Sequence, residues 1–148
     1  MIVGVRDYKV VEAFRTDGSD SRKFRRIFKF AFLETLQISF YGIRSLPDSF
    51  GNLTNLRYLD LSISSLLERL PQSFRNLINL QHINLSDCIE LKKLSDTFHN
   101  LTLLRYLDLS FFLNLTMSNE TLRKISTLDY IWLPFPLQQQ LEKDLIGL

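Results

Sequence analysis

The chain is poor in the residues that mark disulfide scaffolds, fibrous proteins and membrane spans. One cysteine among 148 residues cannot form an internal disulfide, which favours a reducing compartment. Five glycines are too few for a collagen-like or linker-like chain. No apolar run is long enough to cross a bilayer, and the short apolar start, broken by Arg6 and Asp7, is a poor signal peptide. These absences predict a globular protein of the cytoplasm.

Sequence signals for catalysis and cofactor binding are also missing. No glycine is followed by lysine, so the chain has no G-x-x-x-x-G-K-[ST] loop for a nucleotide phosphate. His82 and Cys88 are a conceivable base and nucleophile, but no third residue that would orient them is apparent. The spacing of metal ligands is absent as well. We expect a protein that is not an enzyme and that holds no cofactor and no metal.

The formal net charge is only +2, but the charge is unevenly distributed. Residues 1–32 carry eight Lys or Arg against four Asp or Glu, and a basic cluster occupies residues 22–29. Such a cluster can bind nucleic acid or acidic lipid. Because no aromatic recognition motif accompanies it, a solvated face or loop is the favoured interpretation.

What the chain does have is leucine at regular intervals. Two phrases, NLTNLRYLDLS from Asn52 and NLTLLRYLDLS from Asn100, differ at one position. They belong to a series in which the six-residue pattern L-x-x-L-x-L recurs every 23 or 24 residues. The series begins at Leu33, Leu56, Leu80, Leu104 and Leu128.

The remainder of each unit is equally regular. Phe50, Phe74, Phe98 and Leu122 keep the 24-residue spacing, and each begins an apolar pattern with a spacing of three, typical of a short helix or 3₁₀ turn. The alternation within L-x-L indicates a short strand with apolar residues facing inward. Hydroxyl side chains stand where they could cap the helical turns, at Ser49, Ser73 and Thr97.

One unit cannot bury its apolar edge alone, but stacked units bury it against each other. The pattern therefore predicts an α/β solenoid with a curved parallel sheet on its concave face and short helices or 3₁₀ turns on its convex face. We expect an N-terminal cap or irregular first repeat over 1–32, repeats over 33–133 and a helical tail over 134–148. A first-repeat strand would lie near Val5, Tyr8 and Val10, and the tail helix would cover the last repeat with Leu137, Leu141 and Leu145.

The units resemble the leucine-rich repeat, L-x-x-L-x-L-x-x-N/C-x-L, with Cys88 at the N/C position. Tyr41, Ser64 and Phe112 depart from it there. The wording LPDSFGNLTNLRYLDLS also resembles the repeats of plant intracellular nucleotide-binding, leucine-rich-repeat disease resistance proteins. This resemblance implies a recognition or autoregulatory domain of a plant defence protein. Its implied partner is a pathogen effector, a host protein or another domain of the parent chain.

The outward strand positions are the candidate partner-binding residues. Successive strands stack about 4.8 Å apart, so equivalent positions form columns on the concave face. Aromatic and arginine residues in these columns have the composition of interface hot spots. The predicted contacts are Arg57, Tyr58, Asp60, His82, Asn84, Arg105, Tyr106, Asp108, Tyr130 and Trp132.

Three functions follow from these features. The first is a non-enzymatic protein-recognition module that uses the concave columns. The second is a structural repeat fragment that packs on its own parent protein. The third is a weak binder of nucleic acid or lipid surfaces through residues 22–29. The exposed row of aromatic residues favours the first, because such a row is an unusual way to meet water.

Overall fold

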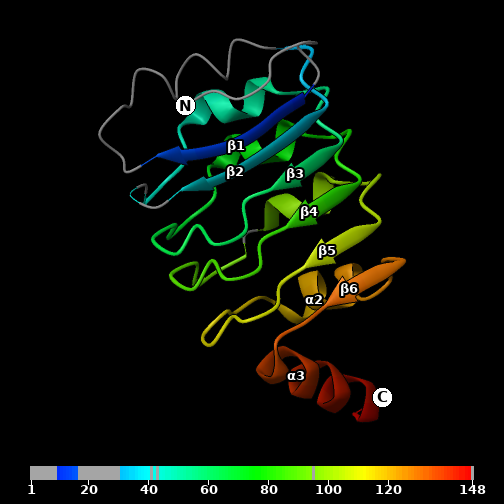
Figure 1. The fold of residues 1–148 in the computed structure, drawn as a ribbon. Coiled ribbons are helices and arrows are strands. Elements are labelled where there is room, and N and C mark those ends of the chain that lie inside the picture. The colour runs from blue at the N-terminus through cyan, green and yellow to red at the C-terminus, as the bar shows by residue number, and fades with distance from the viewer. Residues whose placement is uncertain (1–9, 17–30, 41, 43, 95, 148) are drawn as a thin grey trace.

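Six parallel strands form one sheet, and their order in the sheet follows the chain. The computed structural model describes residues 10–16, 31–40, 42, 44–94 and 96–147. Figure 1 shows the strands stacked as a ladder from the N-terminal to the C-terminal end. The strands are β1 (Val10–Thr16), β2 (Thr35–Phe40), β3 (Tyr58–Asp60), β4 (His82–Asn84), β5 (Tyr106–Asp108) and β6 (Tyr130–Trp132).

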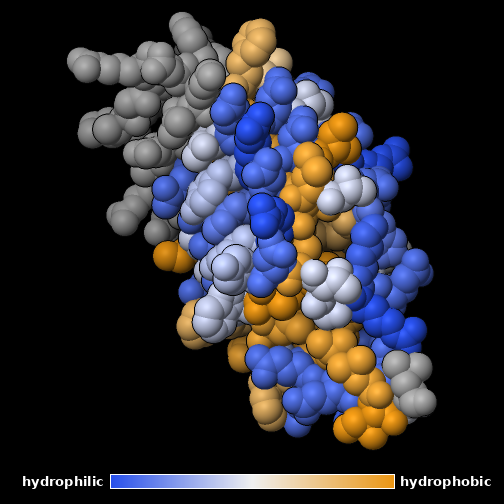
Figure 2. Space-filling view, turned by 90° about the vertical axis from the view of Figure 1, so that its right-hand side faces the viewer, coloured by the Kyte–Doolittle hydropathy of each residue, from blue (hydrophilic) through white to orange (hydrophobic). Residues whose placement is uncertain are grey.

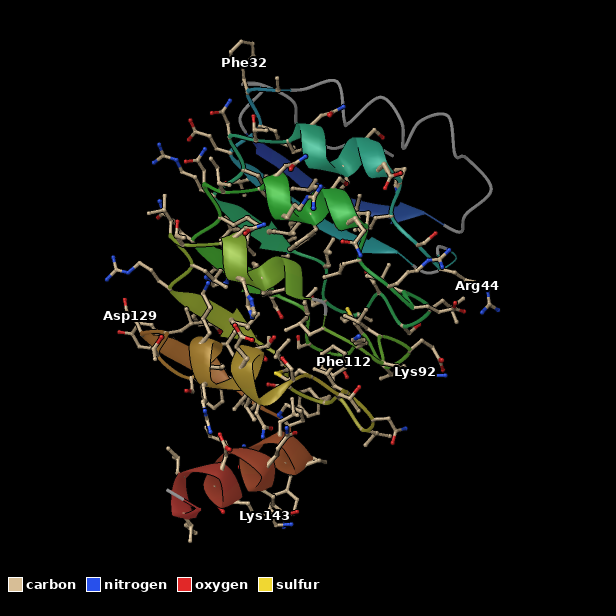
Figure 3. All side chains as sticks on the ribbon, turned by 180° about the vertical axis from the view of Figure 1, so that it is seen from behind. Phe32, Arg44, Lys92, Phe112, Asp129 and Lys143 are labelled. Carbon is tan, nitrogen blue, oxygen red and sulfur yellow. The ribbon has the colours of Figure 1, made fainter. Side chains whose placement is uncertain are left out.

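Short helical segments cover one face of this sheet. Figure 3, seen from behind, shows them stacked in a second layer. They are η1 (Asp48–Asn52), η2 (Gln72–Asn76), η3 (Asp96–Asn100), α2 (Asn119–Ile125) and α3 (Phe135–Ile146), of which the first three are 3₁₀ helices. The predicted solenoid, with a parallel sheet on one face and short helices on the other, is confirmed. Among the described helices, none is long and apolar enough to cross a membrane.

The repeating apolar residues form the core between the two layers. Leu59, Ile83 and Leu107, in the middle of three successive strands, are each 0% exposed. On the helical side, the rings of Phe50, Phe74 and Phe98 are stacked with centroids 6.1 and 5.6 Å apart. The predicted register of the repeat is therefore correct, because equivalent positions of successive units face the same core.

Of the hydroxyl side chains predicted to cap the helical turns, Ser73 makes no such bond, and the side chain of Thr97 lies outside the described part of the chain. The N-cap positions of η1 and η2 are Pro47 and Pro71, and neither makes a side-chain capping bond. The hydroxyl of Ser73 is buried without a hydrogen-bond partner in the described part of the chain. The side chain that does cap a helix is Ser118, whose Oγ accepts a hydrogen bond from the backbone N–H of Thr121 at the start of α2.

The N/C position of the repeat is buried in three units, with different chemistry in each. The thiol of Cys88 donates to the carbonyl oxygen of Leu61 in the preceding unit, 3.2 Å away. Burial raises the pKa of this thiol to about 12, so Cys88 is protonated and unreactive at neutral pH. Ser64 is also fully buried, whereas Phe112 fills the equivalent position with an apolar ring.

The two ends of the chain differ in detail from the sequence prediction. A strand does precede residue 33: β1 spans Val10–Thr16 and so includes Val10 of the predicted strand, and its pairing with β2 contains a bulge. Residues 1–9 and the basic cluster at 22–29 lie outside the described residues. The boundaries at 32 and 133 remain predictions.

The predicted C-terminal helix is present as α3, and it packs beside α2. Leu137 is buried and Leu141 is partly buried against the core, but Leu145 is 59% exposed, contrary to expectation. The last turn is instead held by Asp144, whose carboxylate accepts hydrogen bonds from the guanidinium of Arg123 at 2.5 and 2.9 Å. This ion pair fixes the last turn of the helix without covering Leu145.

Candidate functional site

The side chains of the first strand position form an aromatic column across β3 to β6. Tyr58 stacks on His82 with ring centroids 4.3 Å apart and an interplanar angle of 18°. His82 stacks on Tyr106 at 3.9 Å and 5°. Tyr106 and Tyr130 are 6.3 Å apart and tilted by 40°. The column arises because the parallel register places these four residues directly opposite one another.

Packing within the column changes the acid–base behaviour of its members. Burial raises the pKa of the Tyr58 hydroxyl, and the negative charge of Asp60 adds to this effect. Burial lowers the pKa of His82, although Asp60 and Asp108 oppose that shift. A histidine between two tyrosine rings is therefore biased towards its neutral form.

The column formed by Asp60, Asn84 and Asp108 was predicted to contact a partner, but its side chains bond to the backbone. The side-chain oxygens Oδ1 of Asp60, Asn84 and Asp108 accept hydrogen bonds from backbone N–H groups two residues ahead, at 2.8, 3.0 and 2.8 Å. These are Asx turns that close the end of each strand. Asp60 is only 7% exposed, which corrects the prediction that its side chain is available to contact a partner.

The loops that follow these turns share one backbone conformation. Ile63, Asp87 and Phe111 come three residues after the turn-forming side chains and have φ angles of 63°, 59° and 64°. This left-handed conformation is unfavourable for isoleucine and phenylalanine. The loop geometry is therefore imposed by the repeat rather than by the intrinsic preference of these two residues.

The arginine column lies at the edge where the strands begin. Arg57 and Arg105 are exposed, and the guanidinium of Arg105 donates to Asp129 Oδ2 over 2.6 Å. Figure 3 labels Asp129 on this edge and Lys92 on the opposite one. Sequence reasoning did not include Asp129. It occupies the same column as Arg57 and Arg105, and its opposite charge was the signal that could have identified it.

Figure 2 views the edge where the strands begin, and it shows a hydrophobic band between polar side chains. The turns of this edge contain Ile78 and Leu103, which are 53% and 49% exposed. Two asparagines on the same edge join successive units: Asn55 and Asn79 each donate from Nδ2 to a backbone carbonyl of the preceding unit over 2.7 Å.

The structure separates the two residues considered as a base and nucleophile. His82 lies on the open sheet face, whereas the Cys88 thiol is buried and bonded to a backbone carbonyl. Within the described residues there is no group of three or more His, Cys, Asp or Glu side chains that could hold a metal ion. The geometry of this face is suited to contact with another molecule.

Fold and site together define a leucine-rich-repeat solenoid with an aromatic column on its concave sheet. Comparison with known families agrees, because residues 31–89 match the family described as leucine rich repeat. Comparison with curated proteins finds no match to this chain.

Proposed function

We propose that the concave face of β3 to β6 is a protein-recognition surface and that the chain is a non-enzymatic recognition or autoregulatory module. The observation that carries this proposal is the aromatic column of Tyr58, His82, Tyr106 and Tyr130. Stacked rings are rigid, so a partner that contacts them loses little side-chain entropy. Leucine-rich repeats are a scaffold on which protein binding is the typical function.

The wider biological role follows from the repeat wording. LPDSFGNLTNLRYLDLS resembles the arrays of plant intracellular disease resistance proteins. We therefore propose a defence-related, cytoplasmic module whose partner is a pathogen effector, a host protein or another domain of the parent chain. In the last case the same face would act by packing on its own parent.

The test is a comparison of two surface variants of this chain. Affinity capture from extracts of cells that express the parent gene identifies a partner, which is then purified and titrated by calorimetry. The double variant Tyr58→Ala and Tyr106→Ala should weaken binding at least tenfold, which corresponds to about 1.4 kcal/mol. Arg75→Ala, an exposed position on η2 on the opposite face, is the matched control and should leave affinity unchanged.

Far-UV circular dichroism must show that both variants keep the fold. Equal affinity of the folded tyrosine variant and the wild type would contradict the proposal. A loss of affinity in Arg75→Ala but not in the tyrosine variant would move the site to the convex face. Whether the captured partner is a segment of the parent or a different protein decides between autoregulation and external recognition.

A further inference from the structure

The rings of the aromatic column do not all present the same surface to a partner. Tyr58, His82 and Tyr106 stack face to face, so they offer a partner only their ring edges and polar atoms. Tyr130 is tilted by 40° from Tyr106, and 66% of its surface is exposed. It is therefore the member of the column whose ring face is open to a ligand.

A second open aromatic residue lies on the same strand. Trp132 is two residues beyond Tyr130, so both side chains point to the same face of β6, about 7 Å apart along the strand. Trp132 is 60% exposed. The end of the sheet at β6 thus carries two adjacent aromatic side chains that are both largely exposed.

A carboxylate stands next to this pair. Asp108 pairs in register with Trp132, and neighbouring strands lie about 4.8 Å apart. Asp108 Oδ1 accepts hydrogen bonds from the N–H and hydroxyl of Ser110, at 2.8 and 2.5 Å. Both hydrogen bonds described for Asp108 involve Oδ1, and the residue is half-buried rather than enclosed, so we take Oδ2 as the oxygen for a ligand.

The charges around the pair favour a cation. Arg105, which precedes β5, is bound to Asp129, so these two charges offset each other. Asp108 then supplies the uncompensated charge, which is negative. This carboxylate would repel a phosphate group, and for that reason a nucleic acid or an anionic lipid headgroup is the wrong ligand.

We propose that Tyr130, Trp132 and Asp108 form a site for an arginine side chain of a protein partner. A planar guanidinium can lie on an aromatic face and donate to a carboxylate at the same time, which a compact ammonium does less well. The site rests on the recognition function proposed above and specifies its partner: a protein segment that presents an exposed arginine to the β6 end of the concave face.

The chain provides its own reporter for this site, because Trp132 is its only tryptophan. The probe is the peptide acetyl-Gly-Arg-Gly-amide, titrated while the fluorescence of Trp132 is recorded. The matched control peptide carries citrulline, which keeps the shape of arginine without its charge. We expect a saturable change in Trp132 fluorescence with the arginine peptide. The citrulline peptide should bind at least about fivefold more weakly.

Asp108→Asn is the matched protein variant. Asn84 already forms the same Asx turn in the preceding unit, accepting from the N–H of Ser86 at 3.0 Å, so the variant keeps the turn and loses only the charge. Binding of the arginine peptide should fall about threefold or more. Tyr130→Ala should weaken it as well, while Arg75→Ala, on η2 on the opposite face, should have no effect.

Four outcomes would overturn the proposal. The first two are that the citrulline peptide binds as tightly as the arginine peptide, or that spermidine gives an equal response at the same concentration of positive charge. The other two are that Asp108→Asn binds the arginine peptide unchanged, or that the arginine peptide does not bind at all. The spermidine result would assign the site to a diffusible cation rather than to a protein.

Failure of this site can be told apart from failure of the recognition function. If the arginine peptide does not bind but the Tyr58 and Tyr106 variant still loses its partner, the arginine site is refuted and the recognition face stands. If the peptide binds and no change on the concave face affects the purified partner, the recognition function is refuted instead.

Discussion

Replacement of Leu85 by aspartate tests the repeat register at its centre. Leu85 follows β4, is 0% exposed, and occupies the inward position equivalent to Leu61 and Leu109. Loss of the buried side chain costs about 1.5–3 kcal/mol. A carboxyl group buried at this position would have its pKa raised by about 3–5 units above the usual value of about 3.9, so at pH 7 it would be largely protonated, which costs a further 4 kcal/mol or so.

The two effects together amount to about 5–7 kcal/mol. That sum is comparable to the whole free energy of unfolding of an ordinary domain, about 5–15 kcal/mol. We therefore expect Leu85→Asp to be largely unfolded at 25 °C. Far-UV circular dichroism and urea unfolding followed by Trp132 fluorescence measure this directly.

Asn84→Asp is the matched control, because it introduces the same side chain one residue earlier on the open face. Asp60 and Asp108 form the same Asx turn in the neighbouring units, so the fold can accommodate aspartate here. Three carboxylates in a row should cost no more than about 1 kcal/mol through repulsion. A native spectrum and a wild-type urea midpoint in Leu85→Asp would refute the assigned register, and so would unfolding of Asn84→Asp.

Two further predictions concern side chains on the strand-beginning edge and in the aromatic column. Leu103→Asn should raise the free energy of unfolding by about 0.5–1 kcal/mol, because Asn55 and Asn79 donate to the preceding unit at equivalent positions; an unchanged urea midpoint would count against this. His82→Tyr should flatten the pH dependence of the thermal midpoint between pH 7.5 and 5.5. The folded state lowers the pKa of His82, so wild-type stability is full above 6.5 and declines as the pH falls below it, and parallel curves for the two proteins would contradict this reasoning.

The central part of the fold could be predicted from the sequence because its signal is local and repeated. Leu59 and Leu61 alternate with polar residues, and the same alternation returns 24 and 48 residues later. A strand with one buried face has only one register that places every leucine inside. The strands, the stacked phenylalanines and the columns on the open face all follow from that condition.

The N-terminal strand was less predictable for a physical reason. Residues 10–16 do not show the L-x-x-L-x-L pattern, and the bulge between β1 and β2 shifts the pairing by one residue after Val11. A bulge changes which residues of a strand share a face, so a period of two in the sequence no longer identifies them. The expected strand near Val5 and Tyr8 matched the pattern only loosely.

The role of the column formed by Asp60, Asn84 and Asp108 was missed. The alternation of apolar and polar residues shows which face of a strand a side chain lies on, but it does not show which group that side chain bonds. Asp60 and Asp108 do come from the open side of the sheet, but a short carboxylate at a strand end can bond its own backbone two residues ahead. The repeated sequence D-L-S contained that signal, since serine follows at the second position in both phrases. Sequence alone could not show how far Asp60 would be buried.

The repeated phrase RYLDLS therefore divides structural from functional positions. Its leucines fill the core and its aspartate closes the strand, whereas its arginine and tyrosine lie on the surface that we propose for recognition. In the β6 unit, tryptophan replaces the aspartate, and Pro134 then begins α3 where the other units form a loop. The tryptophan removes the carboxylate that forms the turn at this position. The same replacement places Trp132 beside Asp108. The departure from the phrase at β6 thus creates the surface that we assign to an arginine, because among β2 to β6 this strand alone has an aromatic side chain at both outward positions.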